Sequence, residues 1–398
     1  MTQKNFYDFF PPPRFLTLPA IGLFISDDAV RFVEYGQGLK GLELKRYGEK
    51  ILPPSVVRSG HVENQEVLVD ILKEMKKQYG FNFVYAALPE EKAYLFQTEI
   101  PIVSPKEIQE TIEFKIEENV PLSLSEVVFD YHVTKGSGGR ILDVVVCVLP
   151  IKVSSVYADI LKAAQLTPLS LEIESQAIVR ATIKKGDQRA ILIINLSRLK
   201  TGFYIASEEI IHFSSTINRG TQSLFGGVSV ATKPTIDKQE GQGEEIKGFQ
   251  NKGNVISGDK TAISTAENVQ HTEAPSPKNL KNTKEISDAN DIQKEKLSTV
   301  FEPEAAEIFK DTAKKFISYW QTYRGNVEGK TIQKIIICGE GSSSEEFANY
   351  LGNQTGIPTE IANVWTNAFS FDEYIPPLDF KESVNYVAAA GLALTPYK

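Results

Sequence analysis

The chain repeats one order of strands and helices, and this repeat restricts the possible folds more than any other feature of the sequence. The first half predicts strands at 21–25, 29–35 and 42–47, a helix at 66–79 and a strand at 83–88. The second half predicts strands at 190–196, 201–206 and 210–214, a helix at 303–320 and a strand at 332–338. Each half therefore reads β-β-β-α-β, in which the helix crosses over and returns the last strand to the same sheet.

A separate unit is predicted between the two halves. Its first helix has a strong start signal in the run Ser104–Glu107 (SPKE), where serine and glutamate can form a capping box and proline takes the first helical position. Ile108, Ile112 and Ile116 then form an apolar stripe on this helix. The other predicted elements are strands at 127–134 and 141–149, a helix at 152–164 and a strand at 168–173. Together they indicate a small α/β module inserted into the first half.

Residues 226–300 differ in composition from the rest of the chain. This 75-residue stretch contains 19 hydrophobic residues and one aromatic residue, Phe249. It buries too little apolar surface to offset the entropy lost on ordering, so we expect a flexible insertion. The predicted organisation is an N-terminal tail (1–18), the first part of a first lobe (19–100), the inserted module (101–174), the first part of a second lobe (175–225), the insertion (226–300), and the rest of the second lobe with a C-terminal return to the first (301–398).

The composition excludes several classes of function. The 398 residues carry a formal net charge of −8, which argues against a nucleic-acid binder because such proteins neutralise phosphates with basic side chains. The two cysteines and four histidines are not at metal-ligand spacing, so we predict neither a disulfide framework nor a metal site. No catalytic constellation is recognisable. The sequence contains no secretory signal and no uninterrupted apolar stretch of about 18 residues, so we expect a cytoplasmic protein.

Several segments in a particular order point to a known fold. They include IGLFISDDAVRFVEY, LPIKVSSVYADILKAAQLTPLSLEIESQAIVRA, IIICGEG and NYVAAAGLAL, and together they extend from about residue 19 to 394 without the insertion. This order resembles the actin-like ATPase fold, a duplicated, ribonuclease H-like fold, and within it the PilM family of type IV pilus assembly proteins. The resemblance implies an α/β, actin-like, two-lobed fold with an inserted small α/β module.

The resemblance also implies a nucleotide site, because actin-like proteins hold Mg²⁺–ATP between their lobes with two β-turns, each containing an acidic residue and a glycine. The first turn falls on Phe24–Ser26 and the second on Asn195–Ser197, so both acids and both glycines are replaced. We therefore expect a degenerate site without ATP turnover, although ATP and Mg²⁺ are the cofactors that such a fold can admit. The residues assigned to this site are Ser26, Asp27, Asp28, Asn195, Ser197, Gly339, Gly341 and Ser342.

A partner role is the second implication of the resemblance. In PilM-like proteins the module and the first lobe form a groove for the cytoplasmic tail of PilN, an inner-membrane protein, so this chain is expected at the cytoplasmic face of that membrane. The residues assigned to the groove are Ile108, Ile112, Phe114, Val120, Pro121 and Leu122. Core packing within the module is the alternative role for the isoleucines. Phe114 lies off their stripe and is the better candidate for a partner contact.

The functional interpretation that follows is a non-catalytic scaffold of a type IV pilus or related type II secretion system, which binds a PilN-like tail and other assembly components. Self-association into a homo-oligomer is left open. A nucleotide-controlled actin-like ATPase is one alternative. Another is an adaptor resembling FtsA, which shares the fold; such chains end in an amphipathic membrane helix, whereas this sequence ends in GLALTPYK.

Overall fold

The structure, a computed structural model, describes residues 19–138, 141–226, 301–324 and 331–397. All of these residues belong to one compact unit, which comprises 1–248 and 298–398. The second unit, Phe249–Leu297, lies outside the described residues. The predicted N-terminal tail and the predicted insertion after residue 226 also lie outside them.

The first lobe is built on a five-stranded sheet with the order β10-β6-β1-β2-β3. Its strands are β1 (Ala20–Ile25), β2 (Ala29–Gln37), β3 (Leu42–Ile51), β6 (Phe83–Leu88) and β10 (Thr167–Ile173). The first three strands form an antiparallel meander, whereas β6 pairs in parallel with both β1 and β10. A short hairpin of β4 (Val57–Arg58) and β5 (His61–Val62) follows the meander.

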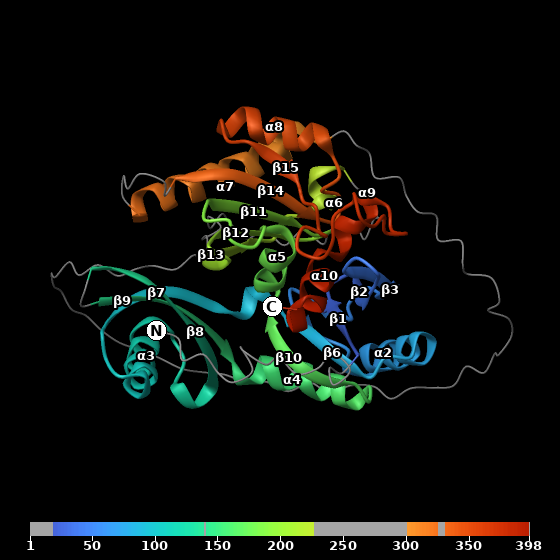
Figure 1. The fold of residues 1–398 in the computed structure, drawn as a ribbon, viewed down its shortest axis with the longest axis horizontal. Coiled ribbons are helices and arrows are strands. Elements are labelled where there is room, and N and C mark those ends of the chain that lie inside the picture. Colours follow the sequence, from blue (N-terminus) through green and yellow to red (C-terminus); the bar gives the residue numbers. More distant parts are fainter. Residues whose placement is uncertain (1–18, 139–140, 227–300, 325–330, 398) are drawn as a thin grey trace, which may run out of the picture. The chain divides into compact units, whose positions relative to one another are not determined.

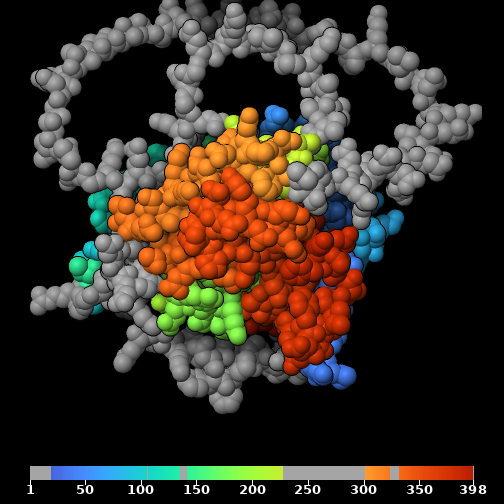
Figure 2. Space-filling view, turned by 90° about the horizontal axis from the view of Figure 1, so that it is seen from above, coloured from blue at the N-terminus to red at the C-terminus, as the bar shows by residue number. Residues whose placement is uncertain are grey.

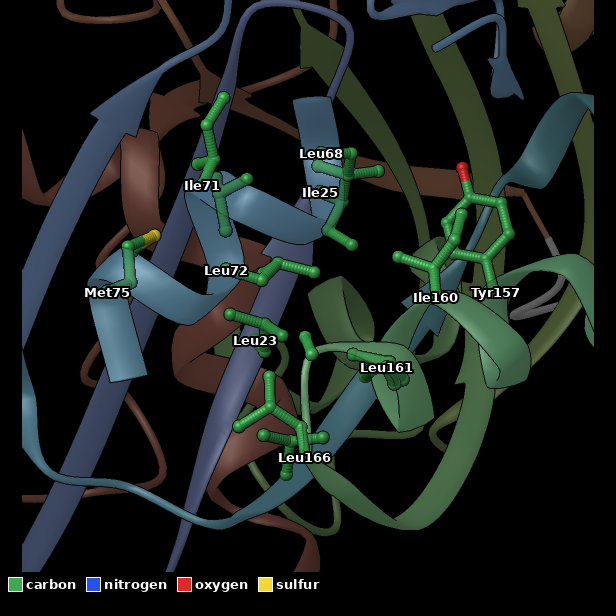
Figure 3. Close-up of a cluster of buried hydrophobic side chains, with 14 of the residues drawn as sticks. Leu23, Ile25, Leu68, Ile71, Leu72, Met75, Tyr157, Ile160, Leu161 and Leu166 are labelled. Carbon is green, nitrogen blue, oxygen red and sulfur yellow. The ribbon is translucent and has the colours of Figure 1, made fainter. Parts of the chain in front are cut away.

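Two helices supply the core on one face of this sheet. They are α2 (Gln65–Tyr79), which Asn64 caps by accepting from the Val67 amide at 3.2 Å, and α4 (Ile151–Ala163). Figure 3 shows side chains from both helices meeting those of β1. The labelled residues in this core are Leu23, Ile25, Leu68, Ile71, Leu72, Met75, Tyr157, Ile160, Leu161 and Leu166. The apolar face predicted for α2 is therefore buried against the sheet.

The second lobe repeats the first. Its sheet has the order β13-β12-β11-β14-β15, with an antiparallel meander followed by two parallel strands. The strands are β11 (Ala190–Leu196), β12 (Thr201–Ser207), β13 (Ile210–Ile217), β14 (Ile332–Gly339) and β15 (Thr359–Ile361). Helices α7 (Pro303–Arg324) and α8 (Glu345–Thr355) cover it, as the orange surface in Figure 2 shows. The short helix α6 (Thr221–Leu224) packs against α7.

Two helices lie between the sheets (Figure 1). They are α5 (Glu174–Thr182) and α10 (Val387–Ala393), which pack against each other, with α10 also against β1. The approach is too close for a side chain, because a Cβ atom at Gly391 would lie 1.8 Å from the Ala177 carbonyl oxygen and one at Gly22 would lie 2.0 Å from that of Ala389. The remaining short helices of this region are α9 (Phe380–Ser383), η4 (Val384–Tyr386) and η5 (Thr395–Tyr397).

The inserted module has a three-stranded sheet with the order β7-β9-β8. Its elements are β7 (Tyr94–Pro101), α3 (Pro105–Asn119), η3 (Leu124–Glu126), β8 (Val127–Gly138) and β9 (Ile141–Pro150). The predicted capping box starts α3, where the Ser104 amide donates to the Glu107 carboxylate at 2.9 Å. The bounds differ from the expected 101–174: β7 belongs to the module, whereas α4 and β10 belong to the first lobe, because β10 pairs with β6 and α4 packs into the first core.

Among the helices of the described residues, none is both long enough and apolar enough to span a bilayer.

Candidate functional site

The first turn of the predicted nucleotide site connects β1 and β2, and its polar groups are engaged within the first lobe. The Ser26 hydroxyl donates to an Asp28 carboxylate oxygen at 2.7 Å. The carboxylate of Asp27 accepts from the backbone amides of Ser59 (2.9 Å) and Gly60 (3.2 Å). Each of the three turn residues therefore already has a protein partner.

A buried cation, Arg31 on β2, neutralises this turn. Its guanidinium lies 3.1 Å from Asp28 Oδ2 and 2.6 Å from Glu49 Oε2. Burial alone would raise the pKa of Asp28, but the charge of Arg31 and hydrogen bonds from Ser26 and Arg31 outweigh it and lower that pKa. Asp28 is therefore a carboxylate paired with arginine.

The second turn, between β11 and β12, contributes another buried cation. The Ser197 amide closes the turn by donating to the Lys200 carbonyl at 2.9 Å. Lys200 is 8% exposed, and its ammonium lies 2.8 Å from Glu91 Oε1. Glu91 belongs to the short helix η2 (Glu90–Lys92), which follows β6 in the first lobe. This ion pair therefore joins the two lobes.

Carboxylates surround Lys200. Burial would lower its pKa, but the negative charges of Glu91, Glu174 and Asp27 outweigh this effect and raise it. Glu174, at the start of α5, is fully buried, and burial raises its pKa to about 7 although Lys200 lowers it. The Asn195 amide donates to Glu174 at 2.7 Å, so the residue that replaces the acid of the second turn contacts a carboxylate.

The glycine loop after β14 is the third part of the predicted site. Gly339 has a φ of +86°, and a Cβ atom there would lie 2.1 Å from the Leu196 carbonyl oxygen. Ser342 is buried, and its hydroxyl has no hydrogen-bond partner among the described residues. Glu340 Oε2 is buried without a hydrogen-bond partner among the described residues, and burial together with the nearby charge of Asp28 in the first turn raises the pKa of Glu340 to about 7. The structure thus brings the predicted loop and both predicted turns together.

This arrangement is a poor fit to magnesium with a triphosphate. Asp28 and Glu340 are two nearby acidic groups, in a place where anionic phosphates would need donors. Arg31 and Lys200 already bind carboxylates. Within the part of the chain that the structure describes, no group of three or more histidine, cysteine, aspartate or glutamate side chains is placed to hold a metal ion.

A cavity of about 450 Å³ lies beside the module and contains none of the residues predicted for either site. Its wall is formed by module strands, by α5 and the preceding residue, by the turn between β12 and β13, and by residues near the C-terminus. The lining residues are Leu95, Asp130, Tyr131, His132, Val145, Cys147, Ile173, Gln176, Val179, Arg180, Lys185, Glu208, Glu209, Ile210, Ile211, Asn367, Leu394 and Tyr397. The cavity therefore touches both lobes and the module.

The residues predicted for the partner groove lie on α3 and the loop after it. Ile112, Ile116 and Val120 are buried, which agrees with the alternative of core packing. Ile108 and Leu122 are half-buried and Pro121 is exposed. Phe114 is 69% exposed, as its position off the stripe suggested. In the module sheet, Val145 and Cys147 line the cavity whereas positions 144, 146 and 148 of the same strand do not, because successive side chains of a strand point to opposite faces.

Sequence reasoning missed the charged residues between the lobes, above all Arg31, Glu91, Glu174 and Lys200. One signal was available: Glu90 and Glu91 follow β6, and Glu174 follows β10, so all three acids come directly after the ends of neighbouring parallel strands. Such strand ends meet at one edge of a sheet.

Comparison with known proteins identifies the family. A profile of the type IV pilus assembly protein PilM matches residues 22–238, more than half of the chain. Among solved structures, the PilM-PilN type IV pilus biogenesis complex is similar at a TM-score of 0.64 and 16% identity, covering 96% of this chain and 99% of that one. No curated protein sequence matches.

Two further structures have lower similarity. The ethanolamine utilization protein EutJ from Carboxydothermus hydrogenoformans has a TM-score of 0.44 at 11% identity, covering 94% of this chain and 88% of that one. MreB5 of Spiroplasma citri bound to ADP has a TM-score of 0.44 at 12% identity, covering 96% and 97%. The predicted actin-like α/β fold is confirmed by the two matching sheets and the similarity to the PilM structure. The chain belongs to the PilM family of type IV pilus assembly proteins.

Proposed function

We propose that this chain is a scaffold of a type IV pilus or related type II secretion system, and that its cavity binds the cytoplasmic tail of a PilN-like inner-membrane protein. Family membership supports the pilus role, and the similar solved structure is a PilM-PilN complex. The observation that carries the proposal is the cavity itself, because it lies between the module, α5 and the second lobe. Binding of the tail would bring the chain to the cytoplasmic face of the inner membrane.

The geometry of the cavity suits an extended peptide. Asp130, Tyr131 and His132 line it from β8, which is an edge strand of the module sheet. An edge strand has one row of backbone donors and acceptors without a strand partner, and an extended segment can pair with such a row. Apolar side chains such as Leu95 and Val145 line the same space and offer contacts for alternate residues of the peptide.

The charges of the cavity favour a basic residue in the tail. Three carboxylates line the wall, those of Asp130, Glu208 and Glu209, against two cations, Arg180 and Lys185. Arg180 on α5 is already paired with Glu172 on β10, so the three carboxylates outnumber the one remaining cation. An extended tail with apolar side chains and at least one basic residue therefore complements this wall.

A substitution that fills the cavity tests the site. Gln176 is a half-buried residue of α5 that lines the cavity, so Gln176→Trp should occupy the space that the tail needs. We expect calorimetry with a synthetic PilN-like tail peptide to show at least tenfold weaker binding. The matched control is Gln354→Trp on the exposed face of α8, which should bind as the native protein does. Equal binding by Gln176→Trp and native protein would exclude the cavity as the site.

The helix α3 offers a second candidate surface. Phe114 is the exposed aromatic residue there, and it was the partner contact predicted from the sequence. If the tail binds α3, Phe114→Ala should weaken binding of the tail peptide by tenfold or more, whereas Gln176→Trp should leave that binding unchanged. If the cavity is the site, the two variants behave in the opposite way.

The scaffold is further proposed to work without ATP turnover. The exchange of both turn acids and both turn glycines supports this, as do the carboxylates that already occupy Arg31 and Lys200. Titration with a fluorescent ATP analogue and magnesium should show no saturable binding up to millimolar concentration. Micromolar binding that is lost on Gly341→Trp would instead support a nucleotide-controlled ATPase.

A further inference from the structure

Polar contacts between the two lobes gather where the two turns face each other. Lys200 of the second lobe binds Glu91 of the first at 2.8 Å. The neighbouring residue Glu90 accepts a hydrogen bond from the Ser214 hydroxyl on β13. The two contacts use a turn and a strand of the second lobe, so they restrain its position at separate points.

These contacts are buried, which makes each of them costly to break. The side chains of Lys200 and Glu91 are 11% and 13% exposed, and Glu90 is buried. Removing one member of a buried ion pair leaves the other as an uncompensated charge, so such a pair strongly opposes separation of the elements that carry it. Separation of the lobes would expose all of these groups to water and to exchange.

Acids outnumber cations at the lobe boundary. Asp27, Glu91 and Glu174 lie around the single ammonium of Lys200 and raise its pKa. Arg31 pairs with Asp28 and Glu49 and also favours the charged form of Glu340. The protein's own cations thus offset part of the acidic charge on both sides of the boundary.

We infer that Lys200–Glu91 and Ser214–Glu90 form an interlobe clamp that holds the two sheets together through protein side chains alone, without a bound nucleotide. The clamp also restrains β13, whose preceding turn forms one wall of the cavity. It does not depend on what the cavity binds.

Hydrogen exchange measured by mass spectrometry on the full-length protein tests the clamp. Lys200→Met keeps most of the length of the side chain and removes its charge. We expect amide exchange to become at least tenfold faster in residues 88–93, 197–201 and 210–217. The matched control is Arg180→Met, which breaks an equally buried ion pair (11% and 15% exposed side chains) between α5 and β10. Its effect should be confined to α5, β10 and the C-terminal residues that Arg180 contacts.

A milder variant covers the case in which Lys200→Met does not fold. Ser214→Ala removes the hydroxyl that donates to Glu90, so exchange in residues 88–93 and 210–217 should become severalfold faster. Native exchange rates there would contradict the clamp, as would native exchange rates at 88–93 and 197–201 in a folded Lys200→Met protein. Adding millimolar Mg²⁺–ATP to the native protein should leave these rates unchanged. Slower exchange on adding it would show that a nucleotide, rather than the clamp, holds the lobes.

Discussion

The boundary between the lobes and the cavity beside the module differ in how their polar groups are satisfied. Between the lobes, Arg31 and Lys200 are buried and bonded to carboxylates. In the cavity, polar side chains such as His132 and Gln176 line about 450 Å³ of space that another molecule can enter. A ligand between the lobes would have to replace existing ion pairs, whereas a ligand in the cavity would add contacts. The structure therefore leaves open space beside the module, whereas the described side chains at the lobe boundary are already paired with one another.

The largest expected effect concerns the buried ion pair. Lys200→Met leaves Glu91 buried without its cation, so we expect the free energy of unfolding to fall by about 3 kcal/mol or more. Urea denaturation followed by circular dichroism measures it. Lys50→Met is the control, because Lys50 and its partner Glu74 are 41% and 58% exposed and such pairs contribute about 0–1 kcal/mol. Equal losses of stability in the two variants would show that the buried ion pair at the lobe boundary contributes no more than an exposed one.

Two glycines provide the next comparison. Gly339 lies at the lobe boundary, where its positive φ and a Cβ position 2.1 Å from a carbonyl oxygen both oppose a side chain, so Gly339→Ala should cost about 3 kcal/mol. Gly186 follows Lys185 of the cavity wall and has a φ of +83°, but nothing lies within 4 Å of its Cβ position. Gly186→Ala should therefore cost only about 1 kcal/mol. Thermal or urea denaturation of both variants measures these losses of stability. A loss for Gly186→Ala as large as that for Gly339→Ala would contradict the difference in packing.

A smaller effect depends on pH. Burial raises the pKa of Glu174 to about 7 in the folded protein, so between about pH 4.5 and 7 the folded state holds a proton that the unfolded state has released. This group therefore contributes stability at low pH that is lost as the pH rises to 7. Glu174→Gln keeps an oxygen that can accept from Asn195 and cannot ionise. Its melting temperature should exceed the native value by a few degrees at pH 8 and by less at pH 5, and a difference independent of pH would refute this assignment.

The smallest effect is expected on the outer surface of the module. Phe114→Ala removes a side chain that is 69% exposed, so the free energy of unfolding should change by less than about 0.5 kcal/mol. Ile116→Ala on the same helix removes a fully buried side chain and should cost about 3 kcal/mol. Urea denaturation of the pair checks the assignment of the isoleucine stripe to the core. A large loss of stability in Phe114→Ala would show that α3 packs with the face that carries Phe114.

Much of the fold could be predicted because it depends on local patterns. The strands at 83–88 and 190–196 were predicted with the bounds that the structure has, and the helix at 66–79 begins one residue earlier. Alternation, helical periodicity and capping act over a few residues, so the sequence displays them directly. The bounds of the module were harder to predict, because β10 joins the first sheet by pairing with β6, which is far away along the chain.

The candidate sites depended more heavily on tertiary structure. The sequence by itself determined that both turns lack the acid and glycine of the actin-like pattern, that the fold is duplicated, and that Phe114 lies off an apolar stripe. Only the tertiary structure decided that Lys200 reaches Glu91, that Ser214 reaches Glu90, and that the cavity opens on the face of the module sheet with Val145 and Cys147. The physical reason is that a local pattern records which side of an element is apolar, whereas a buried ion pair or a cavity exists only where distant segments meet.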